Sequence, residues 1–296
     1  MTALWNSASA LLVLTGLFLG LSLPFGKLAG AAGVSPAAWA FLISLGGGGV
    51  LALSLLLARR GFAPSGHKLR YFAVTALVSY AVPNLLLFSV IPHLGAGFSG
   101  ILYTLSPIVT LLLSLLFKLR RPNALGLAGL AVGFAGALLV ALTRGEAGRP
   151  AEAFWVVLGL LLPVSLAVGN IYRTRDWPDG AGPIELAAGS NLAAALILAG
   201  VMLAGTGGLP LDSLAAVPGL ALAQVLASAM MFAIFFRLQA VGGPVYLSQI
   251  GYVAAAVGLF AGTVFLGERY GILTWTGAAL IVAGVAMTSR AQARAS

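Results

Sequence analysis

The chain contains no cysteine, and both charged residues and histidines are scarce in it. The absence of cysteine excludes disulfides, thiolate metal sites and cysteine nucleophiles. With two histidines and seven acidic residues in total, there is little material for a metal centre, and we expect no metal and no cofactor. Charged residues make up 8% of the chain, against about 25% in a typical soluble domain.

Hydrophobic residues account for 60% of the 296 positions, more apolar surface than one water-soluble core can hide. The sequence therefore predicts an integral membrane protein surrounded by lipid. The net charge of +9 comes from short clusters of basic residues rather than from one basic face, so we expect no nucleic-acid partner. The first apolar run follows no basic segment and is long enough to span a bilayer. We interpret it as a membrane span rather than a cleaved signal.

Apolar segments of about 20 residues, the length that a helix needs to cross a bilayer, recur along the whole chain. Ten spans are predicted, at residues 8–28, 37–57, 71–91, 96–117, 124–143, 153–173, 184–204, 217–237, 244–266 and 271–289. An even number of spans places both termini on one side. The loops on that side hold 12 basic residues, Arg173 and Arg175 among them, and the opposite loops hold three. This asymmetry predicts that both termini are cytoplasmic.

The two halves of the chain resemble each other. "LSLPFGK" (21–27) matches "VSLAVGN" (164–170), and "GVSP" (33–36) matches "GAGP" (180–183). In the fifth and tenth predicted spans, Leu125, Gly129 and Gly136 recur as Leu273, Gly277 and Gly284. We therefore predict two five-helix repeats, residues 1–147 and 148–296. An odd number of spans inverts the second copy, an arrangement typical of secondary transporters with a site between the halves.

Polar residues stand in the middle of the third predicted span, where they are costly in lipid. Tyr80 and Asn84, in the segment "YAVPN", are four residues apart and share a helix face. In the fourth span, polar residues form a stripe at i, i+4, i+7, i+11 and i+15: Ser99, Tyr103, Ser106, Thr110 and Ser114. We predict that Tyr80, Asn84, Ser99, Tyr103 and Ser106 bind substrate. The alternative is that these residues make hydrogen bonds between packed helices.

The second half carries its own candidates. Gln249 and Tyr252 lie in the ninth span and Gln224 and Ser228 in the eighth, and we predict all four as substrate-binding residues. Ser165 and Asn170 in the sixth span are weaker candidates for the same lining. Prolines within the spans, namely Pro24, Pro107 and Pro163, are candidate hinges, with static kinks as the alternative.

Charged residues lie at the ends of the predicted spans, where Lys27, Glu185 and Glu268 are found. Because no carboxylate lies at the midplane, coupling to a proton or sodium gradient finds no support, and facilitated movement is favoured. The predicted site is neutral, aromatic and lined by hydroxyl groups. Such a site suits a small, partly apolar solute or a zwitterion.

With these features in place, the chain resembles an EamA-type member of the drug/metabolite transporter superfamily. The resemblance lies in "LPFGK" (23–27), "IPHLGAGFSGILYTLSPIVTLLLSLLF" (91–117), "QAVGG" (239–243) and "FLGERYGILTWTGAALIVAG" (265–284). One departure is "FKLRRPN" (117–123), where the family often has an acidic "GE" turn. The resemblance implies a carrier of the bacterial inner membrane that exports amino acids or similar metabolites. Within the superfamily, YddG-type aromatic amino-acid exporters are the favoured subgroup, with methionine and threonine as further substrates.

Transport of a different solute remains open, whereas a pore and an enzyme are disfavoured. A carrier of another small metabolite or drug-like amphiphile fits the same pattern. A pore needs a continuous polar track, whereas the polar residues here become fewer toward the ends of the spans. An enzyme is not expected, because no phosphate-binding loop, H-E-x-x-H motif or pair of mid-membrane acids occurs. The sequence leaves the oligomeric state open, with a monomer as the expectation.

Overall fold

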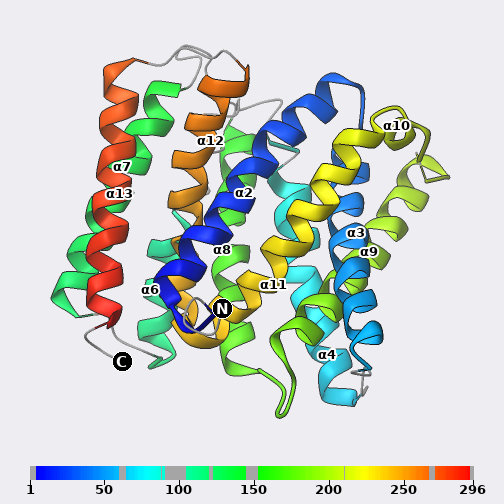
Figure 1. The fold of residues 1–296 in the computed structure, drawn as a ribbon, viewed down its shortest axis with the longest axis horizontal. Coiled ribbons are helices and arrows are strands. Elements are labelled where there is room, and N and C mark those ends of the chain that lie inside the picture. Colours follow the sequence, from blue (N-terminus) through cyan, green and yellow to red (C-terminus); the bar gives the residue numbers. More distant parts are fainter. Residues whose placement is uncertain are drawn as a thin grey trace.

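The structure is a computed structural model, and it describes residues 5–59, 65–87, 89–90, 105–119, 123–144, 153–209, 211–266 and 271–293. Within these ranges all regular secondary structure is helical (Figure 1). Each of the ten predicted spans contains a described helix. The prediction of an all-α membrane fold is confirmed.

The first half contains helices α2 (Ala8–Ala31), α3 (Pro36–Leu57), α4 (Gly66–Thr75), η1 (Ala76–Ala81), α6 (Ser106–Leu116) and α7 (Ala124–Arg144). Serines define where three of these helices begin. Ser7, Ser35 and Ser65 each accept a hydrogen bond from the backbone N–H three residues later. These bonds satisfy amide groups that a helix start otherwise leaves unpaired.

The second half contains α8 (Ala153–Arg175), α9 (Pro183–Thr206), α10 (Leu211–Ala215), α11 (Pro218–Ser248), α12 (Ile250–Leu266) and α13 (Ile272–Ala293). The short helix α10 falls in a predicted loop. The loop predicted between the eighth and ninth spans is replaced by a kink inside α11. At that kink Gly243 has a φ of 75°, which glycine adopts without strain, and Pro244 follows it.

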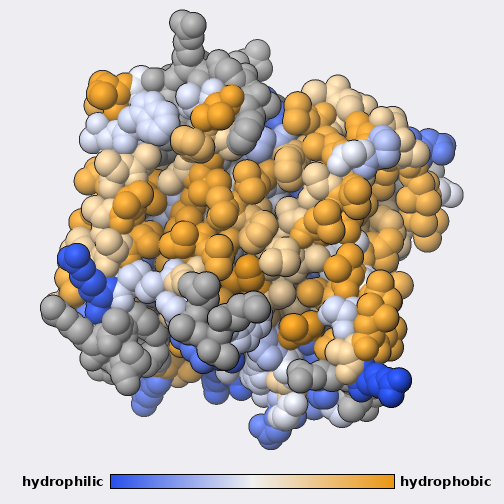
Figure 2. Space-filling model, in the orientation of Figure 1, coloured by the Kyte–Doolittle hydropathy of each residue, from blue (hydrophilic) through white to orange (hydrophobic). Residues whose placement is uncertain are grey.

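Seven of the described helices are long and apolar enough to cross a bilayer, and shorter apolar helices accompany them. Leucines and other large apolar residues on these helices are exposed, including Leu57, Leu196 and Ile272. In Figure 2 apolar residues cover the middle of the visible face, and hydrophilic residues gather at the lower end. The start of α2 and the end of α13 lie in the lower half of Figure 1, which has the same orientation. This distribution is that of a multi-pass membrane protein.

The helices pack in an arrangement that relates the two halves. Helix α7 packs along α13 at one edge, and α3 packs along α9 at the other (Figure 1). Helix α2 packs against α11 and α12, while α8, its counterpart, packs against η1 and α6. The first span of each half therefore packs against the third and fourth spans of the other half. This symmetry is expected of two inverted five-helix repeats.

Glycines bring α7 and α13 into close contact. A β-carbon added at Gly136 would lie 2.6 Å from the carbonyl oxygen of Gly277, and one at Gly284 would lie 2.6 Å from the α-carbon of Gly133. Gly129 likewise faces the Gly284 carbonyl. We call this contact the glycine seam: Gly129, Gly133 and Gly136 of α7 against Gly277 and Gly284 of α13. Small residues allow the backbones to approach closely where lipid provides no hydrophobic driving force.

Candidate functional site

A cavity of about 130 Å³ lies between the two halves. Helices α2, α3, η1 and α6 line it from the first half, and α8, α11 and α12 line it from the second. A comparable cavity of about 150 Å³ accepts benzene in a soluble protein, so this one has room for a small organic solute. Its wall mixes aromatic and aliphatic side chains with hydroxyl and amide groups.

The third predicted span contains a π-helical segment, η1, at the cavity wall. Its ladder includes a hydrogen bond from the Val82 N–H to the Leu77 carbonyl, five residues earlier. The Ser165 hydroxyl of α8 donates to the Val78 carbonyl at 2.8 Å, a contact between the halves that satisfies an oxygen of this segment. Segments of this kind occur often at functional sites. No feature of the local sequence indicated it.

Tyr80 and Asn84 both line the cavity, as their four-residue spacing predicted. The Tyr80 ring packs edge-on against Phe232 of α11, with ring centroids 5.3 Å apart. The Tyr80 hydroxyl is buried and makes no hydrogen bond of ordinary geometry within the described part of the chain, although the Asn191 side chain lies close enough to interact with it. Leaving such a group unpaired in an apolar interior costs roughly 1–3 kcal/mol. A polar group of a ligand would relieve that cost.

Gln224 and Ser228 of α11 also line the cavity. The Gln224 amide nitrogen donates to Ser22 Oγ at 3.0 Å and to Ser228 Oγ at 2.8 Å. Its carbonyl oxygen, Oε1, is buried without a partner among the described residues. The amide is thus held on its donor side, and its acceptor side has no partner among the described residues.

Arg173 introduces a positive charge into the same wall. It lies in the last turn of α8, and its side chain is 1% exposed. Its guanidinium donates to Gln239 Oε1 at 3.3 Å, to Asn170 Oδ1 at 2.6 Å, and to Ser79 Oγ. Its central carbon also lies 4.8 Å from the centroid of the Phe235 ring. Three neutral oxygens and an aromatic face therefore hold this charge in place.

Two expectations about charge are wrong. Arg173 is not an inner-loop residue, because α8 continues to Arg175 and buries Arg173 within the bundle. Without Arg173 the predicted basic residues on the side of the termini number 12 − 1 = 11, still more than the three opposite. The site is also not neutral, since Arg173 is among the residues that line the cavity.

The polar stripe of the fourth span turns inward where the structure describes it. Ser106, Thr110 and Ser114 are all buried, and Ser106 lines the cavity. Thr110 accepts a hydrogen bond from the Asn170 amide at 3.3 Å, and Asn170 lines the cavity as well. Ser99 and Tyr103 lie outside the described residues, and so does Glu268.

Gln249 and Tyr252 lie elsewhere in the bundle and are not among the residues that line this cavity. Gln249 accepts a hydrogen bond from Thr288 of α13 at 2.7 Å. The Tyr252 ring packs on α7, where a β-carbon at Gly133 would lie 3.0 Å from it. These contacts connect α12 to the α7–α13 pair. A role for either residue in binding substrate stays a prediction.

The three candidate hinges occupy different positions. Pro24 and Pro163 are buried inside α2 and α8. Pro107 lies in the first turn of α6, where its missing N–H breaks no helical hydrogen bond. Whether any of these prolines acts as a hinge stays a prediction.

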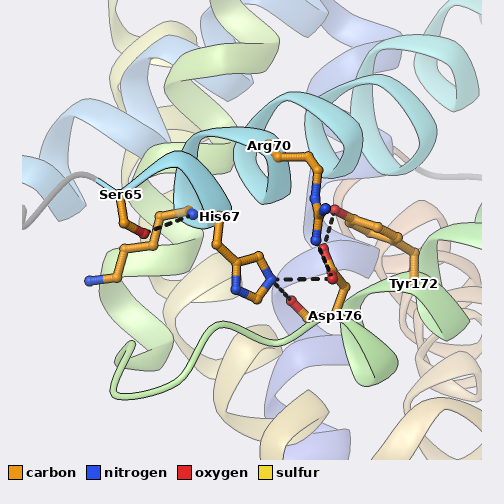
Figure 3. A network of polar contacts seen from close by, with 6 residues as sticks. Ser65, His67, Arg70, Tyr172 and Asp176 are labelled. Carbon is orange, nitrogen blue, oxygen red and sulfur yellow. Dashed lines mark hydrogen bonds and ion pairs between the residues drawn. The ribbon is translucent and has the colours of Figure 1, made fainter.

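A polar cluster joins the halves near the chain ends, between the start of α4 and the end of α8 (Figure 3). The Asp176 carboxylate accepts from Arg70 at 2.8 Å and from the Tyr172 hydroxyl at 2.6 Å, and His67 Nε2 lies 3.2 Å from it. Nearby, Lys68 and Glu185 form an ion pair at 2.7 Å. Burial raises the pKa of Asp176, but the Tyr172 hydrogen bond and the Arg70 and His67 contacts outweigh it, so the net pKa lies below its usual value.

Within the described residues, no group of three or more histidines, cysteines or acids could hold a metal ion. The described lining of the cavity offers hydroxyls, amides, a guanidinium and apolar side chains. Such a set can bind and orient a small solute.

Comparison with known proteins agrees with this geometry. A family model described as "EamA-like transporter family" matches residues 6–142 and matches again at 153–290. A solved structure described only as "Crystal structure of protein" is 19% identical, with a TM-score of 0.74 over 98% of this chain and 99% of that one. At this identity the likeness shows the fold alone. No curated protein matches the chain.

Proposed function

From the chain's membership of the EamA-like transporter family, we propose that it carries neutral amino acids across the bacterial inner membrane by alternating access. Aromatic amino acids are the favoured substrates, with methionine and threonine as further ones. The proposed direction is export, with both termini cytoplasmic. The basic residues on the side of the termini support this orientation.

The cavity between the halves is the observation that carries the proposal. Its wall holds two buried polar atoms without hydrogen bonds of ordinary geometry to the described residues, the Tyr80 hydroxyl and Gln224 Oε1. Gln224 Oε1 is an acceptor and suits a hydrogen-bond donor of the substrate. The apolar part of the wall, which includes Met231 and Phe232, suits an uncharged side chain. One solute that carries both groups is a neutral amino acid.

Facilitated movement is the mechanism that these residues support best. The described lining contains no carboxylate that could take up a proton or coordinate sodium. Two inverted repeats that enclose a site can expose it alternately to each side by rocking. Substrate binding at the cavity would then stabilise the closed intermediate through contacts with both halves.

Counterflow in proteoliposomes tests this function. Vesicles loaded with unlabelled phenylalanine should accumulate external labelled phenylalanine transiently, because a carrier exchanges solute while a pore only equilibrates it. The accumulation should be insensitive to an imposed proton gradient. A screen with methionine, threonine, nucleosides and quaternary amines defines the range of substrates. Uptake of nucleosides or amines without any amino acid would overturn the substrate class, and equilibration without counterflow would favour a pore.

A further inference from the structure

The charge in the cavity wall points to a ligand class. Arg173 is the only charged side chain among the described residues that line the cavity. A guanidinium presents a rigid fork of donors that matches a carboxylate, and it keeps its positive charge when buried. Its effect on an anion is large here, because an apolar, lipid-surrounded wall screens charge much less than water does.

Three of the acceptors around Arg173 are weaker than a carboxylate would be. Ser79, Asn170 and Gln239 offer neutral oxygens to the guanidinium. Hydrogen bonds between two charged partners are roughly twice as strong as those between neutral groups. A carboxylate that enters the cavity can therefore compete with the serine hydroxyl for the same donor.

We infer that Arg173 binds the carboxylate of the transported solute, so that the cavity takes small monocarboxylates and rejects the corresponding amides. The inference rests on the proposed carrier function and narrows its substrates to one chemical class, the small monocarboxylates.

Arg173 connects the two halves as well as facing the cavity. It belongs to α8 in the second half, whereas Ser79 belongs to η1 in the first. Gly169, one turn before Arg173, has no side chain where Ser79 approaches, and a β-carbon there would collide with the serine hydroxyl. A carboxylate that replaces Ser79 as acceptor removes a polar contact between the halves. Binding of the solute is thereby linked to the position of one repeat relative to the other.

The first test uses the wild-type protein and needs no variant. Thermal shift in detergent is measured with L-phenylalanine, L-phenylalaninamide and 3-phenylpropanoate, which has the carboxylate but no ammonium group. Both carboxylates should stabilise the protein, and the amide should bind about 10- to 100-fold more weakly than phenylalanine. Equal binding of the acid and the amide would overturn the inference. So would a failure of every carboxylate in a wider panel, from acetate to phenylpropanoate.

The second test uses Arg173→Gln, with Arg175→Gln as the matched control. Arg175 lies two residues further along α8, is exposed, and stacks on Phe117 outside the cavity. Arg173→Gln should abolish the preference for acid over amide, whereas Arg175→Gln should retain it. An equal weakening of all three probes by Arg173→Gln would show that Arg173 only shapes the fold, and would contradict the inference.

The outcomes separate this inference from the proposed function. Stabilisation by 3-phenylpropanoate but not by any amino acid would retain the carboxylate site at Arg173 and refute the amino-acid substrate. Stabilisation by phenylalanine and its amide alike would retain an aromatic substrate and refute the role of Arg173. If Arg173→Gln does not fold, the acid and amide comparison on the wild-type protein still decides.

Discussion

Two of the contacts between the halves of the molecule differ in chemistry. At the glycine seam, α7 and α13 touch backbone to backbone, with no space for a single added β-carbon at Gly136 or Gly284. Beside the cavity, α8 meets η1 and α6 through the bonds of Ser165 to Val78, of Arg173 to Ser79 and of Asn170 to Thr110, and Gln239 of α11 supports Arg173 from within the second half. We call this the polar contact, made by Ser79, Ser165, Asn170, Arg173 and Gln239. Tight apolar packing resists deformation, whereas hydrogen bonds can exchange partners.

This difference suggests that the two contacts have different roles in the transport cycle. The glycine seam would hold α7 and α13 together throughout a transport cycle, because any separation loses close packing along both helices. The polar contact would break and re-form, because each of its bonds can be replaced by one to a solute. Each prediction below disturbs one side of this comparison.

The largest expected effect is on the glycine seam. Gly284→Ala should lower the melting temperature in detergent, because its β-carbon would force the α7 and α13 backbones apart, at a cost of at least about 1–3 kcal/mol. Gly49→Ala in α3 is the matched control, since its β-carbon would meet no atom within 4 Å. Gly49→Ala should leave the melting temperature unchanged or raise it. Equal melting temperatures for the two variants would show that the seam is not tightly packed.

A smaller effect is expected at the cavity. Tyr80→Phe removes a hydroxyl that we assign to the substrate, so it should weaken phenylalanine binding about 2- to 10-fold with little change in stability. Tyr71→Phe is the control, because the Tyr71 hydroxyl is equally buried and unbonded within the described residues but does not line the cavity. Thermal-shift titrations with phenylalanine measure the affinity of both variants. If both variants bind like the wild type, the Tyr80 hydroxyl does not face the solute.

The smallest effects are expected at the cluster near the chain ends. Glu185→Gln should destabilise the protein more than Asp176→Asn, since the side chains of the Lys68–Glu185 pair are each 12% exposed whereas that of Arg70 is 62% exposed. An exposed ion pair contributes only about 0–1 kcal/mol. Because the pKa of Asp176 is lowered, its contribution should be complete above its usual pKa of about 3.9 and be lost as the pH falls below that value.

Melting curves of wild type and Asp176→Asn between pH 3 and pH 8 check this dependence. The difference between the two proteins should be present above about pH 5 and shrink in the acid range as Asp176 takes up a proton. A difference that is unchanged down to pH 3 would show that the charge of Asp176 is not what stabilises the cluster.

The sequence was sufficient for the all-α membrane fold, because the length of each apolar run can be read locally. It did not predict α10 or the continuation of α11 to Ser248. It was also sufficient for the inward face of the third span, since Tyr80 and Asn84 are one turn apart on a single helix. It did not reveal Arg173, because "RTRD" (173–176) has the appearance of a charged loop. In a helix, residues i and i+2 point in directions about 200° apart, so Arg173 points inward and Arg175 outward. The spacing of Leu162, Leu166, Asn170 and Arg173 on one face of α8 was the signal available.

Other features depend on long-range packing and could not be read locally. The π-helical segment is supported by Ser165, 87 residues away from Val78. Gln249 and Tyr252 were predicted at the site from their polarity alone. Their actual orientation depends on the kink at Gly243 and on packing of α12 against α7 and α13, which a single helical pattern does not contain.

Distance measurements between spin labels test the central claim most directly, and a chain without cysteine allows clean labelling at introduced pairs. Leu69→Cys in α4, which continues into η1, with Asp179→Cys, just after α8, reports on the separation of the halves beside the polar contact. Leu127→Cys with Val282→Cys reports on the glycine seam. On addition of phenylalanine, or of whichever carboxylate stabilises the protein most, the first distance should shift by more than about 2 Å while the second stays constant. An unchanged first distance with bound carboxylate, or a shift in the second, would contradict the account.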